Sequence, residues 1–205
     1  MKTHILTGLT TLGLVASADA SASLLTNGSF ESSNGSFDGW TVVPTPDPLS
    51  TWGIETGRGQ TGSAQDGTYA AVAFGDGADG YFYQSFATAP NVIYDLAFYA
   101  ARPQTNNNNF SLDIDIFDGA GDPTGTADGG LLDVTIPNGG VPSGGSWVLF
   151  QYQFQAASSQ TTLRFSDPGT SAVDPLVDNV SVVPEPSSLA LLGLGGLLVA
   201  RRRRG

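Results

Sequence analysis

The chain of 205 residues contains no cysteine and a single histidine, His4. The missing thiols exclude disulfides, cysteine nucleophiles and cysteine-ligated metal centres. His4 lies in an N-terminal segment that we expect to be removed, so the mature protein also lacks imidazole. This excludes a Ser-His-Asp triad and any histidine-built metal site. The side chains left for chemistry are carboxylates, amides, hydroxyls and aromatic rings.

Basic residues are also scarce. The chain has 8 Lys and Arg against 19 Asp and Glu, which gives a formal net charge of −11. Between the two terminal segments the basic residues are Arg58, Arg102 and Arg164, and lysine is missing there. Nucleic acid is excluded as a partner, because neutralising phosphates requires clustered Lys and Arg. We interpret the acidity as solubility outside the cell, with calcium affinity as the alternative.

Long hydrophobic runs are missing as well, and both apolar stretches of note are terminal. Residues 1–22 contain Lys2, an apolar run from Ile5 to Val15, and Ala18-Asp19-Ala20. These are the three parts of a secretory signal peptide. The run of about 11 residues is shorter than the ~20 that a membrane-spanning helix needs. We therefore expect signal peptidase to remove this segment; the alternative is a retained anchor.

The C-terminal segment, residues 183–205, has three elements in order: a Pro-Glu-Pro triplet, an apolar stretch and an arginine cluster. A helix over residues 187–200 would extend about 21 Å, short of the ~30 Å hydrocarbon core. A helix of this length predicts that the chain is anchored only temporarily in the inner membrane, with the arginines on the cytoplasmic side. We expect the prolines to keep the segment extended and away from neighbouring strands. The residues of the triplet and of the arginine cluster are Pro184, Glu185, Pro186, Arg201, Arg202, Arg203 and Arg204.

This arrangement resembles the PEP-CTERM sorting signal. The resemblance implies export through the inner membrane of a Gram-negative bacterium that makes extracellular polysaccharide. It also implies processing by an exosortase, a membrane transpeptidase-like enzyme, and a final location at the cell surface or in the extracellular matrix of a biofilm. An ordinary tail anchor is the alternative, and it explains the helix and the arginines but not the triplet.

Between these signals, residues 23–182 show hydrophobic alternation with a period near two. Leu112, Ile114 and Ile116 alternate with Asp113 and Asp115, as expected for half-buried strands. Many short strands separated by turn residues predict an all-β fold, a two-sheet antiparallel β-sandwich of the jelly-roll type. The expected strands are residues 25–31, 40–43, 51–55, 69–74, 80–86, 93–100, 110–117, 131–136, 147–155, 161–166 and 176–183.

The segment 118–130 contains spaced aspartates and glycines. Its spacing departs from the EF-hand calcium loop, so we interpret it as a solvated hairpin loop. A calcium loop is the alternative.

Two motifs at the ends of this body carry a second resemblance. Asn27-Gly28-Ser29-Phe30-Glu31 is followed by Gly39-Trp40, and the last strand contains Asp178-Asn179-Val180. They resemble motifs of jelly-roll carbohydrate-binding modules and galactose-binding-like domains. The resemblance implies that the first and last strands lie side by side and that Glu31 and Asp178 hold a structural Ca²⁺, with Asp66 or the carbonyl of Thr68 as a further ligand. The alternative is that Glu31 faces solvent and Asp178 caps a turn.

Sugar rings stack on exposed aromatic faces, so the aromatic residues carry the carbohydrate prediction. We expect Trp40 in the core and Trp147 buried or at an edge. Trp52 is the tryptophan expected to be most exposed. Tyr81 and Tyr83 share one face of their strand and line either a cleft or the core. The candidate carbohydrate-binding residues are therefore Trp52, Tyr81 and Tyr83.

We expect an exported glycan-binding protein and not an enzyme. A purely structural surface protein without a ligand is the main alternative. A glycoside hydrolase is a third possibility, because Asp113 and Asp115 share one strand face with carboxyls roughly 5 to 7 Å apart.

Overall fold

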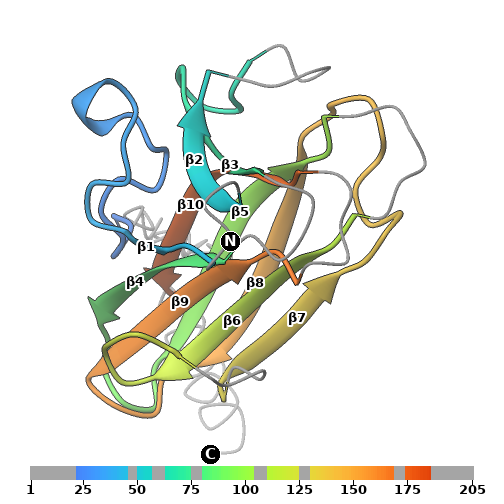
Figure 1. The fold of residues 1–205 in the computed structure, drawn as a ribbon. Helices are drawn as coiled ribbons and strands as arrows, with labels where there is room; N and C mark the ends of the chain where they lie inside the picture. The colour runs from blue at the N-terminus through green and yellow to red at the C-terminus, as the bar shows by residue number, and fades with distance from the viewer. Residues whose placement is uncertain are drawn as a thin grey trace, which may run out of the picture. The chain divides into compact units, whose positions relative to one another are not determined.

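Short alternating segments form the strands of this protein, as the sequence predicts. The computed structural model describes residues 22–45, 50–56, 63–74, 80–103, 110–124, 130–168 and 174–185. All of these residues belong to one compact unit, Ala22–Glu185. Two antiparallel five-stranded sheets pack face to face (Figure 1), which confirms the expected β-sandwich.

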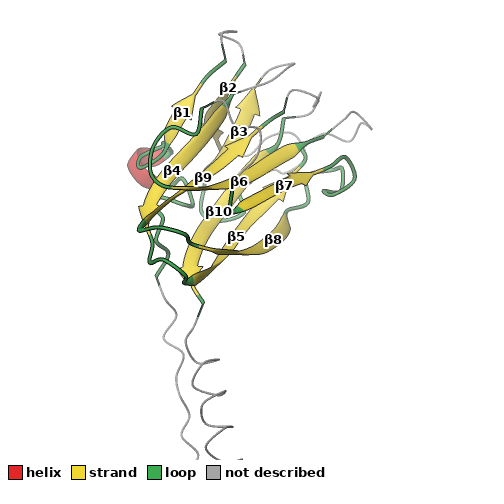
Figure 2. Ribbon diagram, turned by 90° about the horizontal axis from the view of Figure 1, so that it is seen from below, coloured by secondary structure: helices red, strands yellow, loops and turns green. Residues whose placement is uncertain are grey.

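Neighbouring strands in each sheet are mostly far apart in the sequence. The first sheet has the order β1-β4-β9-β6-β7, and the second has the order β2-β3-β10-β5-β8. Figure 2 shows the two layers from below, with β7 and β8 at the same side of the sandwich. The strands are β1 (Thr41–Val43), β2 (Thr51–Glu55), β3 (Ala70–Phe74), β4 (Tyr81–Ala87), β5 (Ile93–Ala101), β6 (Leu112–Asp118), β7 (Leu132–Ile136), β8 (Val148–Gln155), β9 (Gln160–Ser166) and β10 (Leu176–Pro184).

Aromatic rings fill the space between the sheets. Phe82 and Phe165 from neighbouring strands stack with ring centroids 5.2 Å apart, and Phe98 from the second sheet meets Phe165 edge to face at 5.1 Å. Trp40 and Trp52 pack against Phe82 at 5.2 and 4.7 Å. Strands β4 and β5 alternate between buried and half-buried residues, so their apolar sides point into this core and their other sides face outward.

The expected first strand, residues 25–31, is wrong. Asn27 and Phe30 have φ angles of 53° and 58°, which belong to the left-handed region and break an extended strand. The Asn27 side chain fixes these turns, since its amide donates to Ser36 O at 2.8 Å and its oxygen accepts from Ser32 N at 3.0 Å. A short 3-10 helix, η1 (Ser32–Asn34), follows.

This N-terminal segment nevertheless lies beside the last strand, as the resemblance implied. Val180 N donates to Gly28 O at 2.8 Å, and Leu24 N donates to Val182 O at 2.8 Å. Gly28 permits this approach, because a Cβ at its position would lie 1.9 Å from Val180 O. The two ends of the sandwich are therefore joined by backbone contacts.

The start of the C-terminal segment also differs from expectation. Pro184 is the last residue of β10 and pairs with Tyr94 of β5, and Glu185 N donates to Ile93 O at 2.9 Å. The first two residues of the Pro-Glu-Pro triplet are therefore docked on a neighbouring strand, and the prolines do not hold them away. A proline is tolerated at this position because it ends the strand.

The expected signal peptide, residues 1–22, lies outside the described residues except for Ala22, and the expected C-terminal helix over residues 187–200 lies wholly outside them. Within the described ranges, no helix has the length and apolar character needed to cross a membrane.

Candidate functional site

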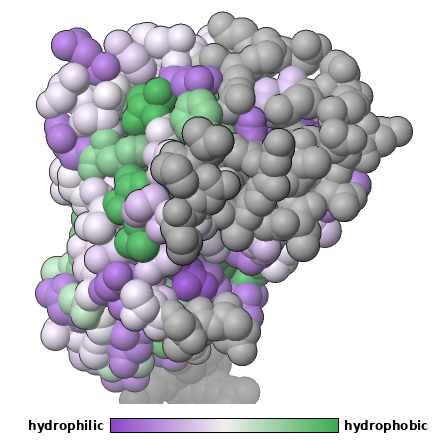
Figure 3. Space-filling model, in the orientation of Figure 1, coloured by the Kyte–Doolittle hydropathy of each residue, from purple (hydrophilic) through white to green (hydrophobic). Residues whose placement is uncertain are grey.

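The outer face of the β1-β4-β9-β6-β7 sheet gathers aromatic and polar side chains. Directly opposite residues in antiparallel strands point to the same face, so the strand register identifies which residues share it. Figure 3 views the molecule from the side of this sheet and shows hydrophilic residues beside a few hydrophobic ones. One row across the sheet consists of Thr41, Tyr83, Arg164, Asp115 and Asp133.

An ion pair between Arg164 and Asp115 occupies the middle of this face. Arg164 Nη2 and Nε donate to Asp115 Oδ2 at 2.7 and 3.0 Å, and Arg164 Nη1 donates to Pro123 O at 3.2 Å. Both side chains are buried, with 8% and 1% exposure for Arg164 and Asp115. The guanidinium carbon lies 4.8 Å from the ring centroid of Phe117 and 5.5 Å from that of Tyr81. The pair therefore fixes two rings of the face through cation–π contact.

Tyr81 and Tyr83 lie next to this ion pair. Both are half-buried, and their ring centroids are 6.2 Å apart. The Tyr81 hydroxyl donates to Asp122 Oδ1 at 2.6 Å. Burial, together with this hydrogen bond, raises the pKa of Tyr81 to about 12. Tyr81 is therefore uncharged at neutral pH, and the two rings belong to the outer face rather than to the core.

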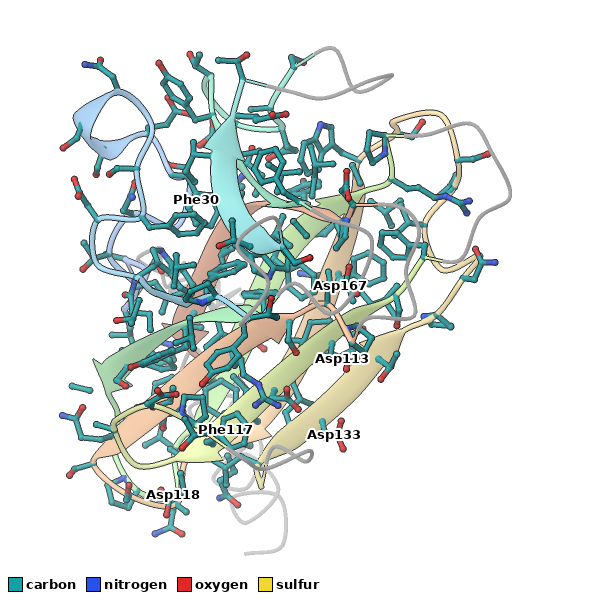
Figure 4. All side chains as sticks on the ribbon, viewed as in Figure 1. Phe30, Asp113, Phe117, Asp118, Asp133 and Asp167 are labelled. Atoms are coloured by element: carbon teal, nitrogen blue, oxygen red, sulfur yellow. The ribbon has the colours of Figure 1, made fainter. Side chains whose placement is uncertain are left out.

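The rest of the face is acidic. Figure 4 shows Asp113 and Phe117 on β6, with Asp133 on the adjacent β7. Asp113 Oδ1 accepts from the Thr135 hydroxyl at 2.6 Å. On the described part of this face Arg164 is the one basic residue, and Asp115 already pairs with it. The face consequently presents net negative charge to a ligand.

The prediction that Trp52 is exposed is wrong. Its side chain is 3% exposed and packs on Phe82, and its Nε1 donates to Gly80 O at 3.3 Å. Trp52 belongs to the inner row of β2, so its ring cannot stack on a sugar. Trp40 is buried as predicted, with 7% exposure. Trp147 is half-buried at the start of β8, and its Nε1 donates to Ser63 O at 3.2 Å.

A second cluster joins the N-terminal segment and β10 to residues 65–69. Glu31 Oε1 accepts from Thr68 N at 2.7 Å and from Tyr69 N at 2.6 Å. Asp178 Oδ2 accepts from Gln65 N at 2.8 Å and from Asp66 N at 2.9 Å, and its Oδ1 accepts from Asn179 N at 2.7 Å. Glu31 and Asp178 therefore hold the two ends of one short segment. We call this arrangement the carboxylate clamp.

Burial dominates the electrostatics of the clamp. Asp178 is fully buried, and this desolvation raises its pKa to about 7 even though three backbone N–H groups favour the charged form. Glu31 and Asp178 both bind the segment 65–69, while their predicted convergence on one cation stays a prediction. It also contains the alternative contact, because Asp178 accepts from the amide of Asn179.

The donor set of the clamp does not form a calcium cage as it stands. Ca²⁺ requires six to eight oxygen ligands, whereas Asp66 and Thr68 present backbone N–H groups to the carboxylates. The described residues include no group of three or more His, Cys, Asp or Glu side chains placed to hold a metal ion. The calcium site at Glu31, Asp178, Asp66 and Thr68 stays a prediction.

In the described part of the segment 118–130, Asp122 is bonded to Tyr81, as in a hairpin loop packed on the sheet. Pro184 and Glu185 lie at the end of β10. The sorting-signal residues outside the described ones are Pro186, Arg201, Arg202, Arg203 and Arg204.

Sequence reasoning missed Arg164, Phe117 and Asp122 as members of the outer face. The alternation of β6 places Phe117 on the same side as Asp113 and Asp115, so its position on the outer face was predictable from the sequence. Arg164 and Asp115 are 49 residues apart, on strands β9 and β6. No local pattern indicates that pairing.

Two family models match this chain. The model described as "Protein of unknown function (DUF642)" matches residues 23–183, and the model described as "PEP-CTERM protein-sorting motif" matches residues 182–204. Among curated proteins, no sequence relative is found. The C-terminal motif confirms the first resemblance and indicates an exported protein that is sorted to the cell surface.

Solved structures with the same fold include carbohydrate-binding modules. TmCBM61, solved with β-1,4-galactotriose, has a TM-score of 0.58 at 16% identity, over 80% of this chain and 100% of that one. The CBM22-1 xylan-binding domain of Xyn10C from Paenibacillus barcinonensis has a TM-score of 0.53 at 17% identity, over 82% and 97%. A cyclase from Fischerella sp. TAU has a TM-score of 0.58 at 16% identity, over 82% and 98%. These likenesses confirm the jelly-roll fold, which both binding modules and an enzyme share.

Proposed function

Because this chain belongs to the DUF642 family and ends in a PEP-CTERM sorting motif, we propose that it is an exported surface protein whose β-sandwich binds a neutral glycan. The binding surface is the outer face of the β1-β4-β9-β6-β7 sheet. The observation that carries this proposal is the central Arg164–Asp115 pair, whose guanidinium lies against the rings of Tyr81 and Phe117 on one face of the sheet.

Glycan recognition needs two kinds of group, and this face has both. Half-buried rings of Tyr81, Tyr83 and Phe117 offer apolar faces for the C–H side of a sugar. Beside them, Asp113, Thr135 and the Tyr83 hydroxyl offer donors and acceptors for sugar hydroxyls. Since the ion pair already fixes part of the face, a ligand meets groups that are largely preorganised.

The charge of the face selects the class of glycan. Asp113, Asp122 and Asp133 would repel the carboxylates of a uronate polymer, and the Arg164 guanidinium is already neutralised by Asp115. A neutral polysaccharide meets no such repulsion. The ligand class proposed here is therefore an uncharged extracellular polysaccharide, in an exopolysaccharide matrix or biofilm.

The proposal assigns no catalytic role. Asp115 is held in the ion pair, and Asp113 accepts a hydrogen bond from Thr135. A retaining glycosidase needs two carboxyls that both face the scissile bond, one of them free to give up a proton. In the proposed route, signal peptidase removes the N-terminal segment, the C-terminal segment holds the chain at the inner membrane for a time, and an exosortase processes it.

Affinity electrophoresis tests the proposal. The Ala22–Glu185 unit contains both sheets and their shared core, so we expect it to fold on its own. We expect gels containing neutral polysaccharides such as β-1,4-galactan or xylan to retard it, and gels containing polygalacturonate not to. Tyr83→Ala is expected to abolish the retardation, whereas Tyr99→Ala, at a half-buried position on β5 of the other sheet, keeps it. Migration unaffected by every neutral polysaccharide would favour a purely structural surface protein.

A further inference from the structure

Strand β8 is an unprotected sheet edge. It spans Val148–Gln155, and among the residues that the structure describes it pairs only with β5, in a continuous register from Ile93 opposite Gln155 to Ala100 opposite Val148. Its sequence, VLFQYQFQ, contains no proline, glycine or charged residue. Proteins usually blunt such edges with charges, prolines, bulges or short strands, because a free edge is a template for another strand.

The other edge strands of the described sheets carry those protective features. β1 has three residues and is followed by Pro44. β2 has five residues and includes Gly53 and Glu55. β7 has five residues, carries Asp133, and is followed by Pro137. β8, with eight uncharged residues, is the exception.

Both sides of β8 leave apolar surface available. On its outer side Leu149 is 44% exposed near one end of β8, and Ile93 of β5, opposite Gln155 at the other end, is 39% exposed. On its inner side Phe150 and Tyr152 are half-buried and stack on Phe98 at 5.5 and 6.3 Å. A shallow hollow is lined by Tyr152 from the inner side and by Asp95, Gln151 and Gln153 from the outer side.

We propose that a second copy of this chain pairs antiparallel with β8 across a two-fold axis. The two β2-β3-β10-β5-β8 sheets then become one continuous sheet, with a pairing length of about 27 Å for eight residues.

The side chains of β8 are compatible with antiparallel pairing between two copies of the strand. If the axis passes through Gln151, Phe150 lies opposite Tyr152 of the second copy, and Leu149 lies opposite Gln153. If the axis passes through Tyr152, Phe150 lies opposite Phe154. Both registers keep aromatic and aliphatic side chains together on one face and glutamines with glutamine or leucine on the other.

Charge also favours a second copy at this strand. The whole chain has a formal net charge of −11, so two copies repel each other over most of their surfaces. Strand β8 brings no charge of its own to the contact, which lets two acidic molecules approach there. This surface lies on the sheet opposite the proposed glycan face, so the inference goes beyond that function and does not depend on it.

Sedimentation velocity of the Ala22–Glu185 unit tests the pairing first. We expect a monomer–dimer equilibrium with a Kd in the micromolar range. Gln151→Glu places like charges at or near the axis and is expected to weaken dimerisation about tenfold or more. Gln160→Glu is the matched control, because it makes the same change at an exposed position of β9, an interior strand of the other sheet. A monomer up to about 0.5 mM, or equal effects of the two substitutions, would overturn the proposal.

Cysteine crosslinking locates the axis, because the chain has no native cysteine. Opposite Cα atoms in an antiparallel pair lie about 4.5 to 5.5 Å apart, within the range that a disulfide bridges. Mild oxidation is expected to link Gln151→Cys dimers if the axis passes through that residue, or Tyr152→Cys dimers if it passes through the next one. Gln160→Cys is the control. A dimer in which neither β8 variant links faster than the control contradicts pairing through β8.

Discussion

Replacing Asp115 by asparagine should destabilise the sandwich strongly. The substitution keeps the shape of the side chain and removes the negative charge that accepts from both Arg164 Nη2 and Nε. The guanidinium then stays buried and keeps the carbonyl of Pro123 as an acceptor, but it loses its ion pair with Asp115. An uncompensated buried charge is among the most costly defects in a folded protein.

The expected loss follows from the burial of the pair. Removing one partner of a buried ion pair costs about 3 to 5 kcal/mol, and the amide oxygen of asparagine recovers part of the hydrogen bonding. We therefore expect a loss near the lower end, about 3 kcal/mol. For a domain of this size that corresponds to a fall in Tm of about 6 to 12 °C. Asp113→Asn changes the same chemistry on the same strand at a less buried site and should cost under about 1 kcal/mol.

Thermal and urea unfolding of the Ala22–Glu185 unit measure these differences. A double variant, Asp115→Leu with Arg164→Met, separates loss of charge pairing from loss of packing. Replacing both partners by apolar groups of similar size is often neutral. The double variant should therefore regain much of the stability that Asp115→Asn loses. If Asp115→Asn is as stable as the unsubstituted unit, or the double variant is worse than the single one, the ion pair does not organise this face.

Three further predictions concern the ends of the sandwich. Burial raises the pKa of Asp178 to about 7, so the folded state binds its proton more tightly than the unfolded state does. The stability of the unit relative to Asp178→Asn, measured by urea unfolding, should fall as pH rises from about 4 to about 7; a rise contradicts the burial argument. If Ca²⁺ binds at the carboxylate clamp, a chelator should lower Tm, and an unchanged Tm removes the calcium prediction. Gly28→Ala should cost about 2 kcal/mol or more in urea unfolding, because its Cβ would overlap Val180 O; an unchanged midpoint contradicts the close approach.

Local sequence patterns predicted most of the strands but not their neighbours. The alternation of Leu112, Ile114 and Ile116 places β6 and identifies its buried face, and these three residues are fully buried. The expected strand over residues 25–31 failed, because its apolar residues serve turns that Asn27 stabilises through its side chain. Hydrophobic alternation carries no information on left-handed φ angles, so this error could not be seen from the pattern.

The candidate site was only partly predictable. Tyr81 and Tyr83 were predicted as site residues because both side chains point to the same side of one strand. The exposure of Trp52 was misjudged, because its loop-flanked position gave no sign that Phe82 would cover it. The Arg164–Asp115 pair depends on β9 lying next to β6, which is a property of the sheet order and not of either strand. Long-range register therefore decides the centre of the site.

The most direct test of the glycan-binding face is a two-dimensional NMR titration of the Ala22–Glu185 unit with an oligosaccharide of the neutral glycan that retards it. Residues of β4, β6 and β9, including Tyr83 and Phe117, should show the largest shifts, and Tyr99 on the opposite sheet should show little change. Shifts centred on β5 and β8, or none with any neutral oligosaccharide, would contradict the account.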